Sequence, residues 1–155
     1  MNKIEASWDK SNYEPNPDFL NINIDGVWLD EFLEKFKHEV KGCIPTLLHM
    51  DDKREEKVVW DRFLPDEGKT SYCPILMCSD DVDFYCICIV AEIQNLGDRV
   101  VWIRIGSDGS DVRIAENVGT EVNWFENYEK LEFTKEDYLK VIDTFKKQYE
   151  LDEKE

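Results

Sequence analysis

Basic residues and long apolar runs are what this sequence has least of. Its 155 residues include 19 Lys and Arg against 35 Asp and Glu, a formal net charge of −16. No apolar run approaches the roughly 18–20 residues that a membrane-spanning helix needs. A surface with this much negative charge is also repelled by nucleic-acid phosphates and by anionic lipid. We therefore expect neither nucleic acid nor a membrane among its partners.

The motifs of common catalytic and nucleotide-binding sites are missing as well. The two histidines, His38 and His49, belong to no His-Glu-x-x-His zinc helix, and no Gly-x-Ser-x-Gly turn occurs. The segment 68–70 (Gly-Lys-Thr) ends like a phosphate-binding loop, but Phe63 stands where the upstream glycine is required. The sequence therefore predicts no catalytic residue and no cofactor, and whether the protein is an enzyme stays open.

Apolar content is nevertheless sufficient for a folded core. Hydrophobic residues make up 42% and aromatic residues 12% of the chain, which excludes a disordered protein. One domain over 1–155 is expected, with an extended N-terminal segment over 1–18 and a frayed acidic tail over 150–155. The N-terminus lacks the apolar segment of an export signal, so we expect a cytoplasmic protein with reduced cysteines.

Hydrophobic periodicity indicates an α+β fold. Two helices are predicted: one from Leu29 to about Gly42, and one beginning at Thr134, whose hydroxyl can cap the helix while Phe133 packs on Tyr138. Residues 51–57 are expected to form an exposed loop or a short helix. We predict a mostly antiparallel sheet of about five strands, over 19–25, 57–63, 84–93, 99–105 and 112–115. The strand over 84–93 is apolar on both faces and should be central, paired with 99–105 in a hairpin.

Five cysteines raise the question of a metal site. Four residues separate Cys73 from Cys78, and Cys86 and Cys88 would share one face of the predicted central strand. Structural zinc favours pairs two to four residues apart on a turn, whereas buried cysteine also acts as a small apolar residue. We interpret the cysteines, Cys43 included, as core residues; a zinc or redox site is the alternative.

Acidic charge is concentrated in the second half of the chain. Residues 71–129 carry three basic and eleven acidic residues, half of the net charge, and no Lys or Arg occurs between Thr70 and Asp98. Since the strands there are apolar, the carboxylates should gather at turns and steer a basic protein partner, with nearby aromatic residues as anchors. The predicted partner-binding residues are Asp80, Asp81, Asp83, Asp98, Asp108, Asp111, Trp124 and Phe125.

The same aspartates allow a second hypothesis. Three carboxylates within four residues can hold Mg²⁺, and pairing Asp80, Asp81 or Asp83 with Glu92 would suit a small metal-dependent hydrolase or nuclease. The Lys that such nucleases place two residues after the Glu is replaced here by Gln94. A solvated loop without a ligand is the remaining interpretation.

The layout resembles that of small bacterial immunity proteins, which neutralise the toxic domain of a polymorphic or contact-dependent toxin. The likeness lies in one acidic α+β domain of this size and in the segments 100–105, 122–125 and 133–139. The resemblance implies stoichiometric inhibition, in which an acidic surface covers the basic substrate cleft of a toxin and mimics phosphate. It carries no functional residues over to this chain.

Overall fold

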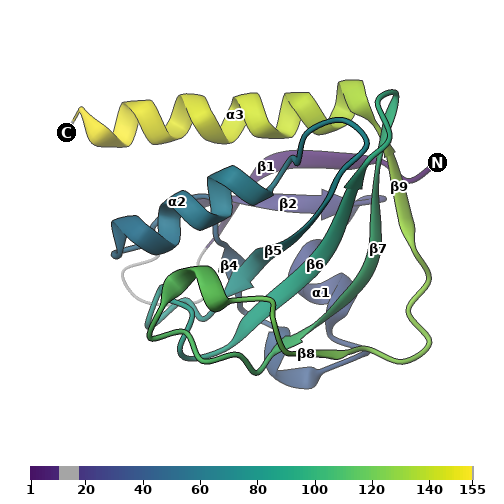
Figure 1. Ribbon diagram of the computed structural model, residues 1–155. Helices are drawn as coiled ribbons and strands as arrows, with labels where there is room; N and C mark the ends of the chain where they lie inside the picture. Colours follow the sequence, from purple (N-terminus) through teal and green to yellow (C-terminus); the bar gives the residue numbers. More distant parts are fainter. Residues whose placement is uncertain (11–17, 155) are drawn as a thin grey trace.

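The computed structural model describes residues 1–10 and 18–154 and has the α+β fold that the sequence predicts (Figure 1). In this part of the chain, nine strands form two antiparallel sheets rather than one sheet of about five strands. The smaller sheet has the order β1-β2-β3; the larger has the order β4-β5-β6-β7-β8, with β9 also paired to β7. The strands are β1 (Ile4–Lys10), β2 (Asp18–Ile24), β3 (Val27–Trp28), β4 (Ile44–Pro45), β5 (Thr70–Met77), β6 (Cys88–Asn95), β7 (Arg99–Asp108), β8 (Val122–Trp124) and β9 (Leu131–Thr134).

Helices lie on and between the sheets. They are α1 (Leu29–Leu33), the 3-10 helix η1 (His38–Val40), α2 (Lys53–Arg62), the 3-10 helix η2 (Ala115–Asn117) and α3 (Lys135–Glu153). The long α3 runs beside β1, and α2 packs against β5 and the C-terminal half of α3 (Figure 1). Because α3 continues to Glu153, the predicted tail over 150–155 is helical and exposed up to that residue. No helix in the described residues is long and apolar enough to cross a membrane.

The predicted hairpin forms the centre of the larger sheet. Strand β6 lies between β5 and β7 and pairs with both antiparallel, which confirms the expected central strand. It begins at Cys88, however, so the first four residues predicted as strand, 84–87, lie in the loop before it. Cys86 therefore lies in this loop and not in the strand.

The start of α3 follows the sequence prediction. Thr134 is the N-cap, and its hydroxyl oxygen accepts a hydrogen bond from the backbone N–H of Asp137 at 3.1 Å. The rings of Phe133 and Tyr138 stack with their centroids 6.1 Å apart, as expected for the apolar contact across a helix start.

A buried aromatic cluster joins the sheet to both long helices. Trp102 of β7 packs edge-on against Phe133 at 5.2 Å, and Phe63, just after α2, stacks on Tyr138 at 5.0 Å. The Trp102 indole N–H donates to the Tyr138 hydroxyl at 3.2 Å, and that hydroxyl donates to the Phe63 carbonyl at 2.6 Å. All polar atoms of the four side chains are thereby satisfied inside the core.

The predicted strand over 57–63 is wrong, because this segment belongs to helix α2. Asp52 caps the helix by accepting from the backbone N–H of Arg54 at 2.8 Å. The buried positions are Glu55, Val58, Val59 and Phe63, whose spacing of three, four and eight residues from Glu55 places them on one helical face. The expected short helix over 51–57 is therefore the first part of a longer one.

Two further predictions are wrong. The helix starting at Leu29 ends at Leu33 instead of near Gly42. A hydrogen-bonded turn over 34–36 follows it, and Phe36 in this turn stacks on Phe125 with ring centroids 5.5 Å apart. Residues 112–115 form no strand; Asp111 accepts a hydrogen bond from the backbone N–H two residues later, and this turn leads into η2. Of the expected extended segment over 1–18, β1 confirms 4–10, and 11–17 lie outside the described residues.

Gly106 allows β8 to approach β7 closely. A Cβ atom there would lie 2.8 Å from the Trp124 Cα, and still closer to the backbone oxygen of Asn123. We expect Gly106→Ala to lower the free energy of unfolding by about 1–3 kcal/mol, because backbone atoms would have to move. Gly109→Ala is the matched control in urea denaturation, since its added Cβ would meet nothing closer than 3.7 Å. Equal losses in both variants would contradict the close-approach argument.

Candidate functional site

One end of the larger sheet gathers most of the predicted partner-binding aspartates. The loop over 78–87 joins β5 to β6, and the loop over 109–121 follows β7. Because Met77 pairs with Cys88 and Ile89 pairs with Ser107, both loops leave the sheet at the same end. Asp98 does not belong to this group, since it lies in the turn between β6 and β7 at the opposite end.

Helix α2 adds acidic residues that sequence reasoning missed. The Phe84 N–H donates to the Glu55 carboxylate at 3.4 Å, which ties the 78–87 loop to the start of α2. The turn after β7 packs η2 against the same helix. This contact could not be predicted from the sequence, because residues 57–63 were expected to form a strand. We call the resulting surface the acidic end; its residues are Asp51, Asp52, Asp80, Asp81, Asp83, Asp108, Asp111 and Glu116.

Several of these carboxylates also hold their own loops. Asp108 accepts from the Ser110 hydroxyl at 2.8 Å and from the backbone N–H of Gly119 at 2.9 Å. Asp111 pairs with Arg113 at 2.6 Å, and the hydrogen bond from the guanidinium lowers the pKa of this carboxyl to about 2. The charge of Asp111 is therefore present at neutral pH, and the positions of both carboxylates are fixed by internal partners.

Exposed apolar groups accompany the acidic end. The Tyr85 side chain is 63% exposed, and its hydroxyl donates to the Val112 carbonyl at 3.3 Å, which links the two loops. Ile114, on the second loop, is 58% exposed. Tyr85 also lies near the guanidinium groups of Arg54 and Arg113, and neither Tyr85 nor Ile114 was predicted from the sequence to bind a partner.

The predicted anchors Trp124 and Phe125 are instead half-buried and engaged with neighbouring side chains. The Arg104 guanidinium lies over the Trp124 ring, 4.1 Å from its centroid, and Phe125 stacks on Phe36. Both line a cavity of about 660 Å³ whose wall includes Lys35 and Lys37. The structure thus places them beside basic residues and not within the acidic end.

The ligand set of the hydrolase hypothesis is not assembled. Glu92 accepts from the Arg104 guanidinium at 2.7 Å and from the Tyr72 hydroxyl at 3.1 Å. Among residues 1–10 and 18–154, one group of three potential metal ligands lies close together, and Asp81 is its one carboxylate. Glu92 is therefore committed to an ion pair within the sheet and is separate from the aspartates of the loop.

The five cysteines are free thiols and divide into two classes. Cys43, Cys73 and Cys88 are buried, which confirms the core interpretation for these three; burial raises the pKa of Cys43 to about 12 and also raises the pKa of Cys73 and of Cys88 above the ordinary thiol value. Cys78 is half-buried and Cys86 is exposed. The sequence-based placement of Cys86 on a strand, beside Cys88, is wrong because β6 begins two residues later.

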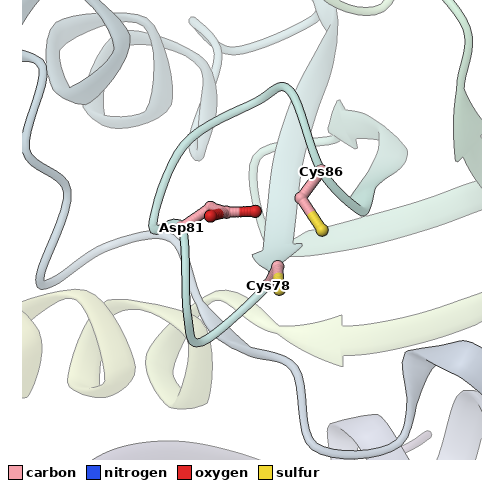
Figure 2. Close-up of side chains that lie close together, drawn as sticks. All are labelled: Cys78, Asp81 and Cys86. Atoms are coloured by element: carbon pink, nitrogen blue, oxygen red, sulfur yellow. The ribbon is translucent and has the colours of Figure 1, made fainter.

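Cys78, Asp81 and Cys86 form the group of potential ligands. The two Sγ atoms and a carboxylate oxygen lie within 4.8 Å of one another, and Figure 2 shows the three side chains gathered where the loop begins and ends. The contact with Cys78 is the main cause that raises the pKa of Cys86 to about 11, and Asp81 adds to it. The Cys86 thiol is therefore protonated at neutral pH when no cation is bound.

Backbone geometry produces this convergence. The Cys78 N–H donates to the Ile87 carbonyl at 3.2 Å, which holds the ends of the loop together. The Val82 N–H donates to the Cys78 carbonyl at 3.0 Å and turns the chain back so that Asp81 approaches the thiols. Val82 has a φ of 47°, a left-handed conformation that costs a β-branched residue about 1–2 kcal/mol. The fold thus maintains a strained turn at the cluster.

Comparison with known proteins gives no further constraint: no protein-family model, no curated protein and no solved structure matches this chain.

Proposed function

We propose that this protein is a binding module that docks its acidic end on a basic protein, in the manner of an immunity-type inhibitor that occludes the basic active-site cleft of a toxin. The observation that carries the proposal is the convergence of three separate segments, the start of α2 and the loops over 78–87 and 109–121, into one surface on which acidic residues outnumber the exposed Arg54 and Arg113. Charge of one sign on one end of a molecule accelerates encounter with an oppositely charged partner.

Exposed Tyr85 and Ile114 support this proposal. Charge alone gives rapid but weak association, whereas binding energy is concentrated in apolar and aromatic side chains that lose water on docking. Tyr85 is held by its hydrogen bond to the Val112 carbonyl, so little conformational entropy is lost when a partner covers it. The carboxylates of the acidic end would occupy the positions of substrate phosphates in a nuclease cleft.

A reducing compartment such as the cytoplasm suits this function, because all five cysteines are free thiols and three of them lie in the core. We expect no binding of nucleic acid or of a membrane surface, since phosphate groups would meet the same negative charge. The protein would act by occupancy, one molecule per target, and not by turnover.

The test begins with the full chain as bait at low salt and elution by a salt gradient, which should release a basic protein. Asp80→Lys is then expected to slow association with that protein by at least about tenfold at low salt, and less at high salt. Stopped-flow or biosensor kinetics would measure both rates.

Asp98→Lys is the matched control, because it makes the same charge change on an exposed turn at the opposite end of the sheet. It should leave the association rate nearly unchanged. Equal slowing in both variants would show that net charge alone matters, and no effect of Asp80→Lys would remove the acidic end from the binding surface.

A further inference from the structure

The donor set of the cluster at the 78–87 loop is that of a soft or borderline metal ion. Two thiolates and one carboxylate are typical zinc ligands, whereas Ca²⁺ and Mg²⁺ prefer oxygen ligands throughout. Cys86 is exposed and Cys78 is half-buried, so a cation can reach both sulfur atoms from solvent. Neither thiol is needed to fill the core, unlike Cys73 and Cys88.

We propose that Cys78, Asp81 and Cys86 bind one Zn²⁺ ion, with a water molecule as the fourth ligand. The three donor atoms already lie within 4.8 Å of one another. Ligand atoms around tetrahedral zinc are roughly 3.5–4 Å apart, given bond lengths of about 2.0–2.3 Å. A shift of about 1 Å by an exposed cysteine and a loop carboxylate would therefore complete the site.

Charge and protons balance in this reaction. Zn²⁺ displaces the protons of the Cys78 and Cys86 thiols, which leave to solvent, and the Asp81 carboxylate binds in its ionised form. The three ligands then carry three negative charges against the two positive charges of the ion. Asp80 and Asp83 flank the site and add a negative potential that favours any cation, but they supply no sulfur and so do not select zinc.

The turn at Val82 gives the site its rigidity. The hydrogen bonds from the Val82 and Cys78 amides fix the loop whether or not a metal is present, so the three ligands are held together before binding. Bound zinc would link the end of β5 to the segment preceding β6 and hold Tyr85, next to Cys86, in place. The inference is independent of the proposed protein binding, because it needs no partner.

The experiment uses the full chain, stripped of metal and fully reduced. Cadmium replaces zinc as the probe, because thiolate-to-cadmium charge transfer absorbs in the ultraviolet. We expect saturation at one equivalent, competition by Zn²⁺ and none by millimolar Mg²⁺. Cys86→Ser should weaken binding at least about 100-fold, since even changes outside the ligand shell alter metal affinity by about 10–100-fold. Circular dichroism checks that this variant, altered at an exposed residue, is folded.

Asp80→Asn and Asp81→Asn form the matched pair that identifies the carboxylate ligand. Both remove one negative charge from neighbouring exposed residues. Asp81→Asn should weaken cadmium binding strongly, whereas Asp80→Asn should weaken it only slightly, by the loss of its share of the negative potential. Equal effects of the two substitutions would indicate diffuse attraction to an acidic loop and overturn the site. Absence of the charge-transfer band in the reduced chain, or full binding by Cys86→Ser, would also overturn it.

Discussion

Trp102→Ala is expected to lower the free energy of unfolding by about 3–5 kcal/mol. Trp102 is fully buried and lies in β7, the strand that pairs with β6, β8 and β9. Its ring contacts Phe63, Phe133 and Tyr138, so truncation leaves a cavity where the sheet meets α2 and α3. The Tyr138 hydroxyl would also lose the hydrogen bond that the indole donates.

Urea denaturation followed by far-ultraviolet circular dichroism measures this loss without relying on tryptophan fluorescence. Trp8→Ala is the matched control: Trp8 also lies in a strand but is 54% exposed, and we expect a change within about 0.5 kcal/mol. A loss at Trp102 no larger than at Trp8 would contradict the assignment of the aromatic cluster as the centre of the core.

Sequence reasoning succeeded where one local signal agreed with the tertiary environment. The β6–β7 hairpin combines a turn over 95–98 with apolar strands, and α3 combines a capping threonine with an apolar stripe. Each of these features places its apolar residues on the face that the fold buries. Local pattern and global packing therefore give the same answer.

Sequence reasoning failed where the strand period of two and the helical repeat both fit the same residues. The segment 57–63 can be read with a period of two, but Glu55, Val59 and Phe63 show the helical repeat once Asp52 is recognised as a cap. Burial of a glutamate inside that repeat hid the pattern, because a charged residue is normally assigned to the exposed face. The strand 84–93 was extended too far for a related reason: apolar residues continue into the loop.

The candidate site, too, was predicted from the sequence only in part. Charge counting located most of the acidic end, since carboxylates excluded from apolar strands must lie in the connecting loops. It could not separate Asp98 from the others without the strand directions. The Cys78–Asp81–Cys86 cluster had no sequence signature, because it depends on a left-handed valine and on the exact residue at which β6 begins.

Glu55 makes the stability of this protein depend on pH. Its side chain is 2% exposed, and Oε1 has no hydrogen-bond partner among the described residues. Burial raises the pKa of this carboxyl from 4.5 to about 7, against the smaller opposing effect of the Phe84 N–H. Between these two pH values the folded chain binds more protons than the unfolded chain, so the free energy of unfolding falls as pH rises, by up to about 3 kcal/mol.

Glu55→Gln keeps the shape of the side chain and removes the titration. We expect the variant to be more stable than the parent above pH 7 and to lose most of the decline in stability between pH 4.5 and 7, as measured by urea denaturation across that range. Glu56→Gln, on the next residue, is the control and should retain the decline. A decline that persists in Glu55→Gln would mean that other carboxylates cause it. Because the Phe84 N–H favours the ionised carboxylate, the loss of stability comes from burying the charge and not from loss of the hydrogen bond to the 78–87 loop.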